Sequence, residues 1–378
     1  MYITVLCKVV DNYGDIGVCW RMCRRLKKLK PENTISLIVD NLVSFNRICD
    51  DVDVEASFQN VLGVDVYNWN NEEVCHEQFI QNDGEKLSVI LECFQCGRPD
   101  WMEKILFEEK LERTVQIIMI DYLTAEKYAE DFHCLKSLTR SAKVQKVNFM
   151  PGFTNKTGGL IIDDEWKELP PYNKDGPVLV FTYTMGTGLQ EAPWSLSFDK
   201  LRNREEVGSL SLSKGLQLKP LPYLNQPDWD KMMKQCSALI IRGEESMSRA
   251  CLSGIPFIWQ AYPQSEEYHL VKVKALLERM KPHFDKEAFE LVEKTWLCIN
   301  GGAPFDPFDR LRDRRDHDDL GCLRQACPEL VDGKAPYDSF FTNLESLRPG
   351  FVSFSQSLQK NGDLCANLMT FIDKIAII

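Results

Sequence analysis

The stretch Cys236–Gln264, which reads CSALIIRGEESMSRACLSGIPFIWQAYPQ, decides the fold of this chain. Its apolar segment Ala238–Ile241 has the length of a buried strand, and Pro256–Trp259 begins a second one. Between them, Met247–Leu252 has the pattern of a helix that ends at the following Ser253-Gly254. Strand, helix and strand in this order predict a parallel β-α-β unit, the building block of α/β proteins.

The junction Arg242–Ser246, between the first strand and the helix, is the first candidate site. Ligands of open parallel sheets bind at the carboxyl ends of strands, and N–H groups at a helix start attract anions. Ser246 is expected to cap the helix, and Glu244 and Glu245 suit its first turn by charge. The junction could hold a phosphate beside sugar hydroxyls, with Arg242 and Arg249 offsetting the acids; a solvated helix start fits the pattern equally well.

Size and charge exclude several classes of protein. The chain has 378 residues with 44% hydrophobic content, enough for two globular domains. Its 45 basic and 56 acidic residues give a net charge of −11, which argues against nucleic acid as the main partner. No apolar run approaches the roughly 18 residues of a membrane span, and no signal peptide precedes the first strand. We therefore expect a cytoplasmic protein.

The cysteine and histidine spacing does not indicate a metal site or another cofactor. Fourteen cysteines are spread irregularly, and Cys93-Phe94-Gln95-Cys96 is the single C-x-x-C. A second pair at zinc-finger spacing is missing, and the five histidines form no i,i+4 pair. We expect reduced thiols that pack in the core or line a site.

The first part of the chain alternates apolar strands with amphipathic helices, which indicates a doubly wound parallel sheet. On the predicted helix Val18–Leu29, the basic residues are expected mostly opposite the apolar face. Strands are predicted over Tyr2–Val10, Thr34–Val39, Val64–Trp69, Leu87–Cys93 and Thr114–Met119, and a second helix over Asp100–Leu111.

A turn-rich linker, Pro170–Pro177, precedes a second α/β unit that opens with a strand over Val178–Thr184. Further helices are predicted over Asp228–Cys236, Glu266–Met280 and Glu287–Trp296, with two closing helices over Tyr337–Ile378 split near Gly362. The predicted fold is α/β, with two Rossmann-like domains facing a central cleft as in GT-B glycosyltransferases. The domains are residues 1–160, with a terminal helix 363–378 packing back on them, and residues 177–362.

Two further groups of residues could carry chemistry. Asp11 and Asp15 bracket a predicted turn after the first strand, where their carboxylates could converge on one acceptor group or cap the next helix. Tyr223 and Trp229 flank Gln226, which suits a flat base because aromatic rings stack and an amide matches its edge. A hydrophobic staple before the next helix fits that spacing as well. Phe181 and Tyr183 share one face of a strand, a pattern more common in core packing.

Three sequence blocks together resemble one known family. They are Val9–Arg21 (VVDNYGDIGVCWR), Met150–Leu160 (MPGFTNKTGGL) and Arg242–Gln264, the last beginning RGEES and ending PFIWQAYPQ. The blocks, their order and their spacing are similar to those of the EarP family, bacterial protein-arginine rhamnosyltransferases that modify elongation factor P. The resemblance covers nearly the full length.

The resemblance implies a GT-B fold and an inverting transfer of rhamnose from dTDP-β-L-rhamnose to an arginine of elongation factor P. Since the helix start at Ser246 could stabilise the departing dTDP without a metal, we expect no metal dependence. The modified factor would then rescue ribosomes stalled on polyproline. Asp15 would be the general base, Asp11 its partner on the guanidinium, and Glu244 a further catalytic residue. The implied donor-binding residues are Gly17, Phe181, Tyr183, Tyr223, Gln226, Trp229, Arg242, Glu245 and Ser246.

Other functions remain compatible with the residues alone. A GT-B transferase with another nucleotide sugar or acceptor, and a non-catalytic protein that binds a nucleotide sugar or the elongation factor, are the main alternatives. Gly186-Thr187-Gly188 weakly suggests a dinucleotide-binding oxidoreductase, although Glu191 occupies the position of the third glycine.

Overall fold

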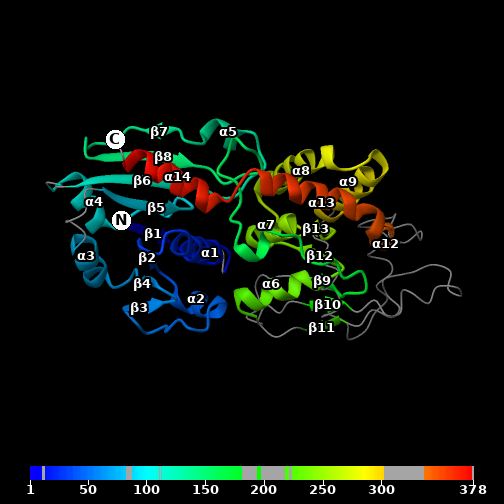
Figure 1. The fold of residues 1–378 in the computed structure, drawn as a ribbon, viewed down its shortest axis with the longest axis horizontal. Coiled ribbons are helices and arrows are strands. Elements are labelled where there is room, and N and C mark those ends of the chain that lie inside the picture. Colours follow the sequence, from blue (N-terminus) through cyan, green and yellow to red (C-terminus); the bar gives the residue numbers. More distant parts are fainter. Residues whose placement is uncertain are drawn as a thin grey trace, which may run out of the picture. The chain divides into compact units, whose positions relative to one another are not determined.

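The computed structural model describes residues 1–10, 13–81, 87–109, 111, 113–180, 194–196, 218–220, 224–301 and 336–376. The chain forms two compact units (Figure 1). The N-terminal unit contains Met1–Lys167, Leu224–Gln226 and Leu358–Ile378; the C-terminal unit contains Glu168–Tyr223 and Pro227–Ser357. Because this division reflects packing, the functional domain boundaries 1–160 and 177–362 stay a prediction. No helix within the described ranges is both long and apolar enough to cross a membrane.

The N-terminal unit is built on an eight-stranded sheet in the order β3-β4-β2-β1-β5-β6-β8-β7. All neighbours pair in parallel except the edge strands β3 and β7, which are antiparallel. Every strand predicted in this unit is present. The strands are β1 (Tyr2–Cys7), β2 (Thr34–Val39), β3 (Phe58–Val61), β4 (Val64–Asn68), β5 (Leu87–Cys93), β6 (Thr114–Ile120), β7 (Lys136–Ser137) and β8 (Val144–Phe149).

Helices cover both faces of this sheet, as its doubly buried apolar strands require. One buried cluster joins the sheet to Met22, Phe45 and Leu368, and another joins it to Phe79 and Met102. The first face is thus covered by α1 (Gly14–Leu29), α2 (Leu42–Ile48) and α14 (Leu364–Ala376), and the second by α3 (Glu72–Gln81) and α4 (Asp100–Phe107). The short α5 (Tyr128–Phe132) follows β6.

Helix α1 differs from its prediction in two ways. It begins at Gly14, so Asp15 lies in the first turn of the helix rather than in a preceding turn. Arg21 and Arg25 are only 1% and 5% exposed, so the prediction that the basic residues mostly face solvent is wrong for these two. They are buried because carboxylates from distant segments pair with them, and sequence periodicity along one helix does not reveal such partners.

The C-terminal unit has a five-stranded sheet in the order β11-β10-β9-β12-β13. β9, β12 and β13 are parallel, whereas β10 and β11 are antiparallel additions. The predicted unit β12–α7–β13 is confirmed, and Gly254 ends α7 in the left-handed conformation (φ 65°) that glycine favours. The elements are β9 (Val178–Val180), β10 (Trp194–Leu196), β11 (Leu218–Pro220), β12 (Ala238–Ile241), α7 (Glu244–Ser253) and β13 (Phe257–Trp259).

The remaining helices follow their predicted positions with one addition. The closing region contains three helices rather than two, because a break at Asn343 separates α12 from α13. The predicted break near Gly362 is confirmed, with Gly362 at φ 87°. The helices are α6 (Gln226–Lys234), α8 (Tyr268–Met280), α9 (Lys286–Gly301), α12 (Pro336–Thr342) and α13 (Leu344–Lys360). The predicted α/β class with two Rossmann-like units, as in the GT-B architecture, is confirmed for each unit by itself.

Candidate functional site

Asp15 is the central candidate in the N-terminal unit. It lies in the first turn of α1, after the carboxyl end of β1, where parallel sheets bind ligands. Its side chain is 2% exposed, and its Oδ2 accepts a hydrogen bond of 2.8 Å from the backbone N–H of Val10. The contact fixes the carboxylate against the loop that joins strand and helix. Asp15 is thus held in one orientation.

The other sequence-predicted residues of this junction are Asp11 and Gly17. Asp11 lies outside the described residues, so the convergence of its carboxylate with that of Asp15 stays a prediction. Gly17 belongs to α1, and its N–H donates to the carbonyl of Tyr13 over 2.9 Å. Its carbonyl accepts a buried hydrogen bond of 2.9 Å from Nε2 of Gln226. Gly17 and Gln226, which are far apart in sequence, therefore meet in this unit.

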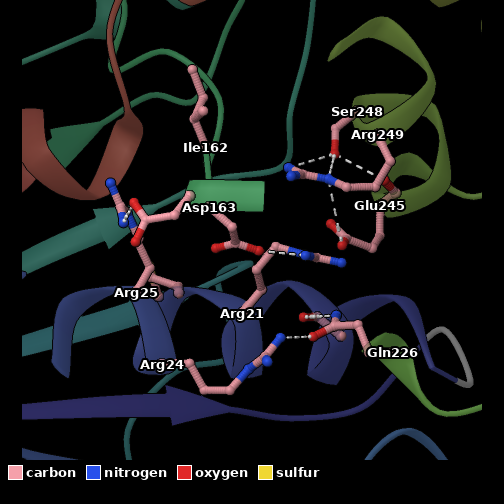
Figure 2. A network of polar contacts seen from close by, with 12 residues as sticks. Arg21, Arg24, Arg25, Ile162, Asp163, Gln226, Glu245, Ser248 and Arg249 are labelled. Carbon is pink, nitrogen blue, oxygen red and sulfur yellow. Dashed lines mark hydrogen bonds and ion pairs between the residues drawn. The ribbon is translucent and has the colours of Figure 1, made fainter. Parts of the chain in front are cut away.

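Ion pairs of the buried Arg21 and Arg25 hold helix α1 in place (Figure 2). Arg21 binds Asp163 with an N–O distance of 2.5 Å. Arg25 binds Asp363 at 2.8 Å through Nε and Asp164 at 2.9 Å through a terminal nitrogen. Asp363 also accepts a 3.0 Å hydrogen bond from the N–H of Ile162. The helix that carries Asp15 is thus tied to two other segments of the chain.

The Asp164 carboxylate stays charged across the ordinary pH range. Hydrogen bonds from Lys167, Lys28 and Arg25 lower the pKa of Asp164 well below its usual value. Because a lowered carboxyl pKa keeps the charged form, Asp164 contributes to stability above its unfolded pKa and loses this contribution only as the pH falls through the folded one. Asp163 and Asp164 were not among the residues predicted from the sequence. The signal available was the adjacent pair Asp163-Asp164 after the apolar Ile161-Ile162.

The second candidate region is the start of α7 in the C-terminal unit. The helix begins at Glu244 with Gly243 at the N-cap and no side-chain cap. The predicted capping role of Ser246 is therefore wrong: the residue lies inside the first turn and is 9% exposed. The helix starts earlier than predicted because both glutamates fit its first turn. N–H groups in a first turn have no partner within the helix, so this end can receive an anion.

The two glutamates of this turn each lie close to a cation. Oε1 of Glu244 is 3.4 Å from Nζ of Lys272 on α8. Oε1 of Glu245 is 3.8 Å from Nε of Arg249, one turn further along α7, and Figure 2 shows the Arg249 guanidinium also beside Ser248. Positive charge thus offsets the acids that would otherwise repel a phosphate at the helix start.

Arg242 lies in the short loop between β12 and α7. Its carbonyl accepts a 2.7 Å hydrogen bond from the indole N–H of Trp259, the last residue of β13. Its guanidinium lies over the ring of Tyr262, 5.0 Å from the ring centre. Two parts of the third sequence block, RGEES and PFIWQAYPQ, are therefore in contact at the carboxyl ends of neighbouring strands.

The predicted base-binding group is described only in part. Phe181, Tyr183 and Tyr223 lie outside the described residues. Gln226 and Trp229 both belong to α6; Gln226 is buried and bound to α1, and Trp229 is half-buried. The structure thus brings Gln226 together with Gly17, and the pocket for a base stays a prediction.

Among the described residues, no group of three histidine, cysteine or acidic side chains is arranged to hold a metal ion. In the C-x-x-C segment, Cys93 is buried and Cys96 is half-buried. Burial raises the pKa of the Cys96 thiol well above its usual value, which disfavours the thiolate that metals bind.

The pattern of blocks, strands and junctions matches a known family. The model of the family described as "Elongation-Factor P (EF-P) rhamnosyltransferase EarP" matches residues 3–177 and 191–373. The chain belongs to the EarP family. The match spans both units and includes the junction of β1 with α1 and that of β12 with α7.

Curated relatives of this chain carry the name protein-arginine rhamnosyltransferase. The Pseudomonas aeruginosa protein is 28% identical over 342 residues, covering 79% of this chain and 87% of its own. The Shewanella oneidensis protein is 28% identical over 347 residues, covering 78% and 84%. The Neisseria meningitidis protein is 26% identical over 343 residues, covering 81% and 86%. The alignments therefore cover most of the length of each of these relatives.

A solved structure from work on EarP-mediated arginine glycosylation of translation elongation factor EF-P aligns with 99% of this chain and 99% of its own. Its sequence identity is 14% and its TM-score is 0.39.

Proposed function

We propose that this EarP-family protein transfers L-rhamnose from dTDP-β-L-rhamnose to an arginine side chain of elongation factor P, with inversion at the anomeric carbon. The modified factor would act on ribosomes stalled at polyproline. The observation that carries the proposal is the family match over both units. The acidic residue at the start of α1 and the uncapped start of α7 supply groups that such a reaction needs.

The acceptor chemistry is assigned to Asp15, with Asp11 as its partner. An arginine has a pKa of about 12.5 or more and a carboxylate one of about 4, so full deprotonation before attack would cost about 12 kcal/mol. The proton must therefore leave as the bond from the arginine nitrogen to the sugar carbon forms. A buried, fixed carboxylate suits this role, because it can bind the guanidinium and accept the proton within one step.

The donor chemistry is assigned to the start of α7. As the sugar–phosphate bond breaks, the electron pair leaves with dTDP, and the helix N-terminus around Ser246 stabilises the added negative charge. Glu244 acts beside the sugar, while Arg242, Glu245 and Ser246 hold the diphosphate end. The thymine is assigned to Tyr223, Gln226 and Trp229 with Phe181 and Tyr183 nearby. No metal or other cofactor is required in this scheme.

The folded acceptor factor is proposed to dock on the N-terminal unit near Asp15, since a guanidinium alone does not distinguish one arginine from another. Nucleic acid and membranes have no part in the reaction, and the enzyme is assigned to the cytoplasm. A short peptide carrying the same arginine should react much more slowly than the whole factor.

The test is the intact mass of purified elongation factor P after incubation with the enzyme and dTDP-rhamnose. We expect the mass to rise by one rhamnosyl group, and a factor with lysine in place of the modified arginine to stay unchanged. Incubation with UDP-glucose in place of dTDP-rhamnose is the donor control. An unchanged mass with dTDP-rhamnose would refute the proposal, and a mass increase with UDP-glucose alone would favour a transferase with another donor.

A further inference from the structure

The side chain of Gln226 is enclosed by the N-terminal unit. Gln226 is the first residue of α6 and is 5% exposed. Its Nε2 donates to the carbonyl of Gly17 over 2.9 Å, and its Oε1 accepts from a terminal nitrogen of Arg24 over 2.6 Å. Figure 2 shows the amide lying against α1 beside Arg24. Both ends of the amide are therefore bound to one helix.

Its neighbour in the chain makes an exposed contact with the same unit. The amide nitrogen of Asn225 donates to Asp50 over 2.9 Å. Together with Gln226, this contact joins the short segment Leu224–Gln226 to the N-terminal unit, although the chain on either side of it belongs to the other unit. The segment is thus held by side-chain contacts on both α1 and the loop after α2.

The Gly17 carbonyl belongs to the same first turns of α1 as Asp15. Its N-cap residue, Tyr13, makes no side-chain capping hydrogen bond. The carbonyl of Gly17, two residues after Asp15, receives a side-chain donor in addition to the helical bond that an oxygen with two lone pairs can accept. A donor at this position adds a contact to the turn that carries Asp15, beside the bond from Val10 to the Asp15 carboxylate.

If the Gln226 side chain recognised the edge of a base, it would have to use its amide oxygen and its amide nitrogen. An amide offers one acceptor and one donor end, and α1 uses both. A buried amide that left α1 for a base would leave the Gly17 carbonyl and the Arg24 guanidinium without this partner. The contacts therefore favour a role on α1 over one on the nucleotide.

We propose that the Gln226 side chain is a positioning residue for α1 and thereby for Asp15, and that any part of Gln226 in base recognition belongs to its backbone. This inference rests on the proposed function in assigning Asp15 to the acceptor. It predicts that loss of the amide impairs the chemical step and leaves nucleotide affinity intact.

The test compares Gln226→Met, which keeps the length of the side chain and removes both hydrogen bonds, with wild type. We expect kcat to fall about tenfold or more, because small displacements of a catalytic group are costly, while KM for dTDP-rhamnose changes less than about twofold. The dissociation constant for dTDP should change by less than about twofold, and amide exchange in the first turns of α1 should accelerate about tenfold.

Two matched variants sharpen the result. Gln226→Glu keeps an acceptor for Arg24 but places a carboxylate against the Gly17 carbonyl, so it should be as slow as Gln226→Met. Asn225→Ala removes the neighbouring exposed contact and should leave kcat and α1 exchange within about twofold of wild type, because surface contacts contribute little.

A dTDP affinity that falls about tenfold in Gln226→Met would overturn the inference, since it would show that the side chain binds the nucleotide. Unchanged exchange of α1 would overturn it as well. Neither readout requires turnover. If the wild-type enzyme left elongation factor P unmodified, the proposed function would fail, while binding and exchange would still decide the role of Gln226.

Discussion

The junction of β1 with α1 and the junction of β12 with α7 occupy equivalent places in the two units. They differ in the partners of their acidic side chains. In the first junction, the Asp15 carboxylate accepts a hydrogen bond from the N–H of Val10, in the loop that precedes α1. In the second, Glu244 and Glu245 lie close to Lys272 and Arg249. One junction thus fixes a carboxylate, while the other neutralises its acids at the start of the helix.

This difference follows from the length of the connections. The segment Lys8–Tyr13 separates β1 from α1 and is long enough for a side chain to reach back to it, whereas only Arg242 and Gly243 separate β12 from α7. A short connection leaves the first-turn N–H groups for an outside anion. The same strand-to-helix geometry can therefore have two uses. In one unit it presents an acid that can bind a cation, and in the other it presents a helix start that can bind a phosphate.

The largest expected effect comes from Asp15→Asn. The amide oxygen can still accept from Val10, so the fold should be preserved, but the base is lost and the transfer rate should fall about 10³-fold. Quenched-flow or timed intact-mass measurements on elongation factor P would give the rate. The matched control is Asp40→Asn, since Asp40 accepts from the neighbouring N–H of Val9 over 2.9 Å. Comparable losses in the two variants would mean that Asp15 is structural.

Arg25→Met should have the next largest effect, on stability rather than on chemistry. It leaves Asp363, whose side chain is 9% exposed, without its partner, and breaking such a buried pair costs about 3–5 kcal/mol. Urea denaturation followed by tryptophan fluorescence would measure the loss. Lys28→Met is the control, because Lys28 is 65% exposed and its pair with Asp164 should contribute less than about 1 kcal/mol. Equal losses in both variants would show that burial of the Arg25 pairs has no special importance.

A smaller effect concerns His133 in the N-terminal unit. Burial lowers its pKa, and its Nδ1 accepts a 3.1 Å hydrogen bond from the N–H of Met150, which requires the neutral ring. The unfolded chain therefore binds more protons, so the free energy of unfolding should decrease as the pH falls below about 6.5. His133→Asn should show a smaller decrease between pH 7.5 and 5.5 in thermal denaturation. An identical pH dependence in both proteins would contradict this assignment.

The smallest expected effect is that of metal removal. Because the start of α7 is proposed to stabilise the leaving diphosphate, treatment with EDTA should leave the transfer rate within about twofold of the untreated enzyme. A lost activity that Mg²⁺ restores would show that a cation, rather than the helix N-terminus alone, opposes the phosphate charge.

Local sequence signals were sufficient for most of the fold. Apolar runs such as Leu87–Cys93 predicted strands with correct bounds, and Gly254 and Gly362 marked helix ends, because these features depend on neighbouring residues. Edge strands β3 and β7 were missed because they are short and largely exposed. The helix starts at Gly14 and Glu244 were placed too late, since acids and glycine suited a turn and a first helical turn alike.

The candidate site was predictable only where its residues are close in sequence. Asp15 and the segment Glu244–Ser246 were found from their blocks. The residues that hold helix α1 were not found. Asp163 and Asp363 pair with arginines of α1, and Gln226 binds Gly17, and the two members of each pair lie far apart in the sequence. Such pairs depend on the three-dimensional fold, and a single sequence carries no local signal for them.

The most direct test of the assignment of the two junctions is calorimetric titration of dTDP into wild type, Asp15→Asn and Ser246→Ala. The account predicts that Asp15→Asn binds dTDP within about twofold of wild type, while Ser246→Ala, which lacks the hydroxyl at the start of α7, binds about tenfold more weakly. Weakened binding in Asp15→Asn with unchanged binding in Ser246→Ala would contradict it.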